Sequence, residues 1–137
     1  MFNCKNVFIA HEKLMNYPTQ APFDPHKLFN ELDFLYKTDS YNKIYITVRK
    51  ILEGIHLDAK NIGSKDWNPF GELVKPGQIV FLKPNLAKHV HRLGDEGLLS
   101  TITHGSVLRP LIDYAFKAVG PEGKIIVGDT PFEHTEW

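Results

Sequence analysis

Two apolar runs in this chain end in polar residues that are candidates for ligand binding or catalysis. The run Gln78-Ile-Val-Phe-Leu-Lys83-Pro84-Asn85 delivers a lysine and an asparagine, and the run Lys124-Ile-Ile-Val-Gly128-Asp129 delivers an aspartate. Parallel α/β sheets build their sites at the carboxyl ends of strands, because the following loops converge in one crevice. We therefore expect Lys83, Asn85 and Asp129 to lie together.

The chemistry predicted at this edge is the binding of an anion. A lysine charge, an amide donor and the unpaired N–H groups of a helix start all favour a carboxylate or a phosphate. In this hypothesis Lys83 holds the anion while His104 or Asp129 moves a proton. We predict catalytic roles for His104 and Asp129, and substrate-binding roles for Lys83, Asn85, Thr103 and Arg92.

Each of these residues also has a structural interpretation. Lys83 could pair with Asp129 across adjacent strand ends, and Asn85 could satisfy backbone groups beside Pro84. An aspartate before Thr-Pro often shapes a turn, and a histidine at a helix start can orient that start. The sequence leaves both interpretations open.

Histidines in the connecting segment suggest an alternative, a metal site. His89 and His91 would face the same way on an extended segment, and His104 could approach as a third nitrogen ligand. Such a site also needs closing ligands and second-shell partners, which a sequence does not display. We therefore assign no metal site and leave the cofactor undetermined.

The elements that position these residues follow from hydrophobic periodicity. We expect a first buried strand at residues 6–10, a helix beginning at Asp24-Pro25, and a second helix from Asp39 or Ser40. Strands follow at residues 79–82 and 124–127. Between them a helix starts at Thr103 or His104, or later near Ser106 because of Pro110, and it ends at Gly120-Pro121.

A strand, a helix and a second strand make a βαβ unit, which forces the two strands to run parallel. The predicted fold is a small three-layer α/β fold, with a mainly parallel sheet of about three strands and helices on its faces. Residues 1–137 would form a single domain or the amino-terminal portion of one. The sheet is expected to be incomplete.

Three motifs in order resemble the family known as domain of unknown function 362: Val80-Phe-Leu-Lys-Pro-Asn-Leu86, Thr101-Ile-Thr-His104 and Lys124-Ile-Ile-Val-Gly-Asp-Thr-Pro131. The resemblance covers roughly residues 73–131. It implies a prokaryotic α/β domain without an established reaction. The chain departs from the family at Gly105, where proline usually follows the histidine, and it lacks both the ferredoxin-like segment of some relatives and the carboxyl-terminal half of longer ones.

Composition narrows the possible partners. Lysine plus arginine equals aspartate plus glutamate at 16 each, so no global field would hold a nucleic acid or an anionic membrane. The single Cys4 excludes an internal disulfide, and no apolar stretch could span a bilayer, so we expect a cytoplasmic protein.

We predict a small-molecule enzyme domain with an anionic ligand. The alternative is a non-catalytic assembly module, completed by a missing half or by another subunit, including a second copy.

Overall fold

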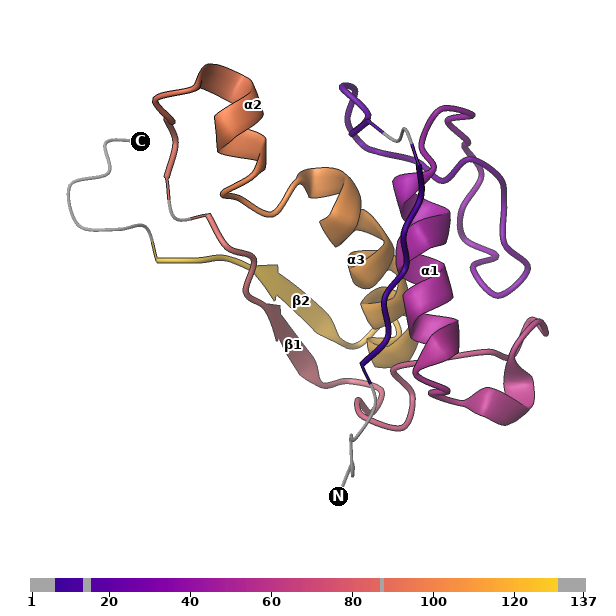
Figure 1. The fold of residues 1–137 in the computed structure, drawn as a ribbon. Coiled ribbons are helices and arrows are strands. Elements are labelled where there is room, and N and C mark those ends of the chain that lie inside the picture. Colours follow the sequence, from indigo (N-terminus) through magenta and orange to yellow (C-terminus); the bar gives the residue numbers. More distant parts are fainter. Residues whose placement is uncertain (1–6, 14–15, 87, 131–137) are drawn as a thin grey trace.

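The computed structural model describes residues 7–13, 16–86 and 88–130, which form a mixed α/β fold (Figure 1). In these residues no helix is long and apolar enough to cross a membrane. A 3-10 turn covers Ala59–Asn61. The main elements are helix α1 (Ile44–Gly54), strand β1 (Ile79–Leu82), helix α2 (Gly94–Leu99), helix α3 (Gly105–Val119) and strand β2 (Lys124–Val127).

The two strands form a parallel pair, in which Ile79 lies opposite Lys124 and Leu82 lies opposite Val127. Helix α3 connects them and packs against both, so the predicted parallel βαβ unit is confirmed. We expected about three strands in a three-layer fold. The part of the chain that the structure describes contains a sheet of two strands, and α3 lies between this sheet and α1 (Figure 1).

The strand predicted at residues 6–10 is not formed in residues 7–10, while Asn6 lies outside the described residues. This segment runs extended along α1 (Figure 1). The ring of Phe8 packs over Gly54, where any Cβ would collide with it, and Glu12 pairs with Lys50 at 2.5 Å. A β-rich sequence alone does not make a strand, because a strand needs a neighbour for its backbone groups.

The helix predicted from Asp24-Pro25 is wrong, because residues 24–36 form turns. The backbone carbonyls that would accept its first hydrogen bonds are already occupied. The Asn42 side-chain amide donates to the carbonyls of Phe23 and Asp24, both at 2.9 Å, and the Asp39 N–H donates to the carbonyl of Pro25 at 2.9 Å. Tertiary contacts thus override an apolar pattern of helical period.

The second and third predicted helices are present with shifted starts. Helix α1 begins at Ile44 instead of residue 39 or 40, since Asp39 closes a turn by accepting the Tyr41 N–H at 3.0 Å. Helix α3 begins at Gly105 and continues through Pro110. It ends at Gly120, as predicted, and this glycine has a φ of 65°. The long connection before α3 contains α2, a short helix that we did not predict.

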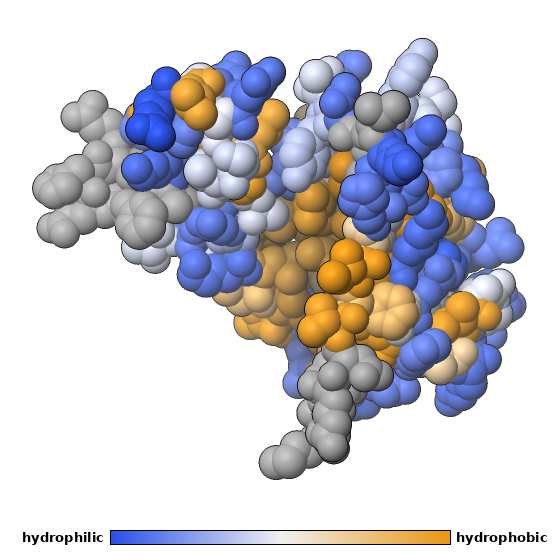
Figure 2. Space-filling view, viewed as in Figure 1, coloured by the Kyte–Doolittle hydropathy of each residue, from blue (hydrophilic) through white to orange (hydrophobic). Residues whose placement is uncertain are grey.

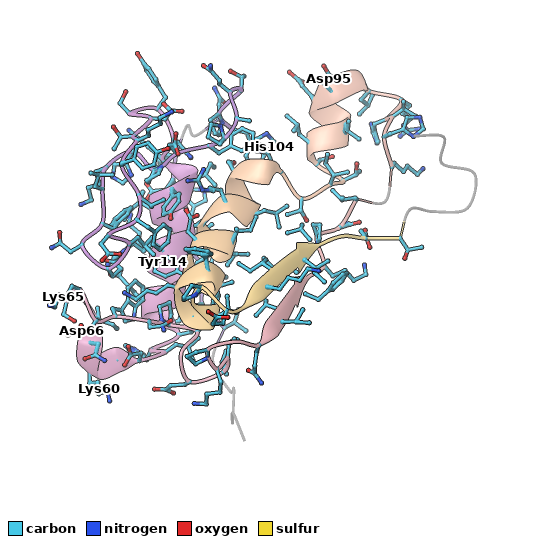
Figure 3. All side chains as sticks on the ribbon, turned by 180° about the vertical axis from the view of Figure 1, so that it is seen from behind. Lys60, Lys65, Asp66, Asp95, His104 and Tyr114 are labelled. Carbon is cyan, nitrogen blue, oxygen red and sulfur yellow. The ribbon has the colours of Figure 1, made fainter. Side chains whose placement is uncertain are left out.

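The hydrophobic core lies between the helices and the irregular segments, away from the sheet. Tyr114 of α3, labelled in Figure 3, meets the ring of Trp67 edge to face at 5.3 Å, and the indole N–H of Trp67 donates to the Leu57 carbonyl at 3.0 Å. The core therefore depends on α1, α3 and residues 29–67. Its buried members are Phe29, Leu32, Tyr45, Leu52, Trp67 and Tyr114.

Candidate functional site

The carboxyl ends of β1 and β2 bring Lys83 and Asp129 into a salt bridge. This pairing follows from the parallel register, which places residue 83 beside the last residues of β2. The Asp129 side chain is only 4% exposed, whereas that of Lys83 is 66% exposed. The lysine therefore covers a carboxylate that is sheltered from solvent, and its own stem remains open to water.

The Asp129 carboxylate is held by more than the lysine. One oxygen accepts the Leu86 N–H at 2.7 Å, and the other accepts the Thr130 N–H at 2.9 Å. The hydrogen bond from Lys83, followed by the backbone bond from Leu86, lowers the pKa of Asp129 below its usual value. Because this carboxylate stays ionised at neutral pH and is a weak base, its geometry suits a structural anchor better than a proton acceptor.

Asn85 and Thr103 join the end of β1 to the segment that leads into α3. The Asn85 N–H donates to the Thr103 hydroxyl at 2.9 Å, and the Thr103 N–H donates back to the Asn85 carbonyl at 2.8 Å. The side-chain amide of Asn85 also donates to the Thr101 carbonyl at 3.2 Å. These bonds fix the course of the chain, and they engage the amide that we expected to bind a ligand.

His104 caps the start of α3 (Figure 3). Its Nδ1 atom accepts the Ser106 N–H at 3.2 Å and lies 2.8 Å from the Ser106 hydroxyl oxygen. The ring stacks on Tyr17 at 4.5 Å and lies 5.1 Å from the ring of Phe23. Burial lowers the pKa of His104, so the neutral ring carries its proton on Nε2 while Nδ1 serves as the cap.

These contacts turn His104 toward the amino-terminal segment. In the described part of the chain, no hydrogen bond or ion pair joins His104 to Lys83 or to Asp129. We expected unpaired N–H groups at the start of α3 to face an anion. One of them, the Ser106 N–H, donates instead to Nδ1 of His104. The two residues predicted to be catalytic therefore occupy separate local settings.

The remaining predicted residues lie in the segment before α2. Arg92 is exposed, and His91 closes a turn by accepting the Leu93 N–H at 3.1 Å. The His91 ring packs over Gly97 so closely that a Cβ there would collide with it. Among the residues the structure describes, no group of three or more His, Cys, Asp or Glu side chains could hold a metal ion. The alternative site of His89, His91 and His104 is therefore not assembled.

Several groups that complete this corner could not be found from sequence patterns. The Leu86 N–H and the Thr101 carbonyl are backbone groups, which every residue type supplies. Tyr17 and Phe23 reach His104 from residues more than eighty positions away, and only the tertiary fold brings them there.

The fold and the corner define an α/β protein whose strand ends are tied together by an ion pair and by side-chain to backbone bonds. No protein-family model, curated protein or solved structure matches the chain. The resemblance to domain of unknown function 362 therefore stays a prediction that rests on the three sequence motifs.

Proposed function

We propose that this chain is an assembly module, whose open parallel sheet is completed by another polypeptide. The observation that carries the proposal is the exposure of one sheet face. Ile79 is 66% exposed, Phe81 58% and Ile126 37%, although all three belong to strands of the apolar type that parallel sheets bury on both sides. Hydrophobic side chains also gather at the surface over the region of β1 and β2 in Figure 2.

The sheet edges support the same proposal. In the parallel register, β2 residues Lys124 and Gly128 donate their N–H groups to the Gln78 and Leu82 carbonyls, both at 3.1 Å. The groups of the alternate residues, including Phe81 in β1 and Ile125 in β2, then point to the two outer edges. No further strand pairs with these edges in the described residues. Such edges are templates for another strand.

Self-association of the isolated chain tests the proposal. We expect light scattering to detect concentration-dependent, polydisperse association, because association removes exposed apolar side chains from water. The double variant Phe81→Ser and Ile126→Ser should stay dispersed with unchanged far-ultraviolet circular dichroism. Ile55→Ser, at an exposed position outside the sheet, is the matched control and should behave like the wild type. Self-association that persists unchanged in the double variant would contradict the proposal, and so would a wild-type chain that stays a monomer at every concentration and binds no other polypeptide at the sheet.

A second candidate function is the binding of an anionic small molecule at the strand ends, as in an enzyme domain. The observation that favours it is the high exposure of Lys83 beside a sheltered Asp129, because an ammonium group has three donors and one carboxylate does not use them all. Arg92, also exposed, adds positive charge in the following segment. In this candidate, a carboxylate or phosphate would share Lys83 with Asp129.

Titration with inorganic phosphate and with acetate tests this candidate. If it holds, the amide resonances of Leu86 and Thr130 shift on titration, because both N–H groups lie on the Asp129 carboxylate beside the lysine. Lys83→Gln should abolish the shifts. Lys75→Gln, at an exposed lysine in the turn before β1, should leave them unchanged. Shifts that persist in Lys83→Gln, or that never occur, would rule out an anion site at this corner.

A further inference from the structure

We propose that the outer face of the sheet binds an amphipathic α-helix of another polypeptide, with an apolar stripe and a carboxylate near each end. This inference rests on the proposed function and names the partner that it requires. Helix α3 already covers one face of the sheet, and parallel sheets are normally covered by helices on both. A helix on the outer face would complete that arrangement.

The residues of the outer face follow from strand alternation and register. Ile79 and Phe81 of β1 stand beside Lys124 and Ile126 of β2, and Lys83 and Gly128 continue the same two rows. The centre of this face is apolar, and each end carries a lysine. Lys124 makes no ion pair in the described part of the chain, and Lys83 remains largely exposed although it pairs with Asp129.

This charge pattern selects the partner. None of the six residues on the face is acidic. Lys124 makes no ion pair in the described residues, and the ammonium group of Lys83 keeps donors beyond its bond to Asp129, so carboxylates of the partner would complement both ends of the face. The rows from residue 79 to residue 83 span about 13 Å at roughly 3.3 Å per residue. A helix rising about 1.5 Å per residue covers this length in about nine residues. The partner is therefore a helix of two to three turns, whose acidic residues lie about seven or eight positions apart so that both fall on the stripe that faces the sheet.

A second copy of the chain is a poorer occupant of the same face. Two identical faces related by a two-fold axis can stack with their strands parallel or antiparallel. In the parallel arrangement Lys124 meets Lys124 and Lys83 meets Lys83, and in the antiparallel arrangement Lys124 meets Lys83. Both bring lysines together, and the carboxylate of Asp129 beside Lys83 is already engaged by that lysine and by two backbone N–H groups.

Binding of designed peptides tests the inference. The probes are labelled helical peptides with leucines on one stripe and either glutamate, glutamine or lysine at both ends of it. Anisotropy is measured at low ionic strength and below the protein concentration at which association begins. We expect the glutamate peptide to bind at least tenfold more tightly than the glutamine peptide, and the lysine peptide to bind most weakly.

Charge reversal on the protein gives the sharper measurement. Lys124→Glu should weaken binding of the glutamate peptide about tenfold and strengthen binding of the lysine peptide, since it reverses one end of the face. Lys60→Glu, at an exposed lysine of the 3-10 turn far from the strands in sequence, is the matched control and should change neither affinity. Lys83 is left intact because its substitution would also release Asp129.

The outcomes separate this inference from the proposed function. One outcome is equal affinity for the three peptides while self-association is still lost in the Phe81→Ser and Ile126→Ser double variant. That result would contradict the acidic helix as the partner, and it would leave the assembly proposal intact. A discrete dimer that excludes the peptides would show that a second copy covers the face, and it too would overturn the inference. A monomeric chain that binds no peptide would remove both proposals.

Discussion

Single buried residues hold the irregular segments of this protein against its helices. Glu31 accepts a hydrogen bond from Arg49 at 2.6 Å and another from the hydroxyl of Tyr114 at 2.8 Å. Asp113 similarly accepts the hydroxyl of Tyr45 at 2.7 Å. Burial raises the pKa of Asp113, while the bonds from Tyr45 and Arg109 oppose that rise. Removing one of these partners is expected to destabilise the protein, because a buried carboxylate would lose a hydrogen bond.

At the residue scale we predict that Tyr45→Phe destabilises the protein by about 1.5–3 kcal/mol, the usual contribution of a hydrogen bond to a charged group. The substitution keeps the ring, which is fully buried, and removes only the donor to Asp113. Urea denaturation measures the change. Tyr41→Phe makes the same chemical change at a side chain that is 86% exposed, and it should alter stability by less than about 0.5 kcal/mol. Equal effects of both substitutions would contradict this account of the Tyr45 bond.

The N-cap of α3 is a titratable residue, so the stability that it contributes depends on pH. His104 accepts the Ser106 N–H through Nδ1, a role that requires this nitrogen to be unprotonated. Burial lowers the pKa of His104 from its usual value of 6.5. The unfolded chain therefore takes up the proton first as the pH falls. The stability that the cap contributes is complete above pH 6.5, and it is lost as the pH falls from 6.5 through the lowered pKa of the folded state.

At the element scale we predict that His104→Asn keeps the cap and reduces the pH dependence of stability. Asparagine is a strong N-cap residue and does not titrate, whereas His104→Ala should cost about 1 kcal/mol at pH 8. Urea denaturation at about pH 8 and pH 5.5 should show a smaller difference for His104→Asn than for the wild type. A part of the difference will remain, because burial also lowers the pKa of His26. An unchanged pH dependence in His104→Asn would show that the cap does not titrate in this range.

At the scale of the whole molecule, the sheet and the core are separated. The core lies between α1, α3 and residues 29–67, and α3 packs against both the core and the strands. A small sheet of this kind contributes little buried apolar area of its own, because one of its faces is open. The outer face can therefore serve for association without being part of what keeps the chain folded. This separation is the physical basis of the assembly proposal and of the variants that test it.

The candidate site was predictable in its location and much less so in its chemistry. Parallel strands and their carboxyl ends follow from topology, so the meeting of Lys83 with Asp129 could be predicted. The internal use of Asn85 and His104 could not, because their partners are backbone groups and distant rings. Whether a ligand binds at this corner stays a prediction for the titration to decide.

Sequence patterns predict the elements whose local preference agrees with their surroundings: α1, α3 with its glycine stop, and the pair β1 and β2. In these segments apolar spacing, turn residues and chain connectivity all favour the same structure. The course of residues 7–10 and 24–36 depends instead on tertiary contacts, because their carbonyls and rings are engaged by distant partners such as Asn42 and Gly54. Such contacts outweigh a local preference, because a buried backbone group must find a partner wherever one is offered.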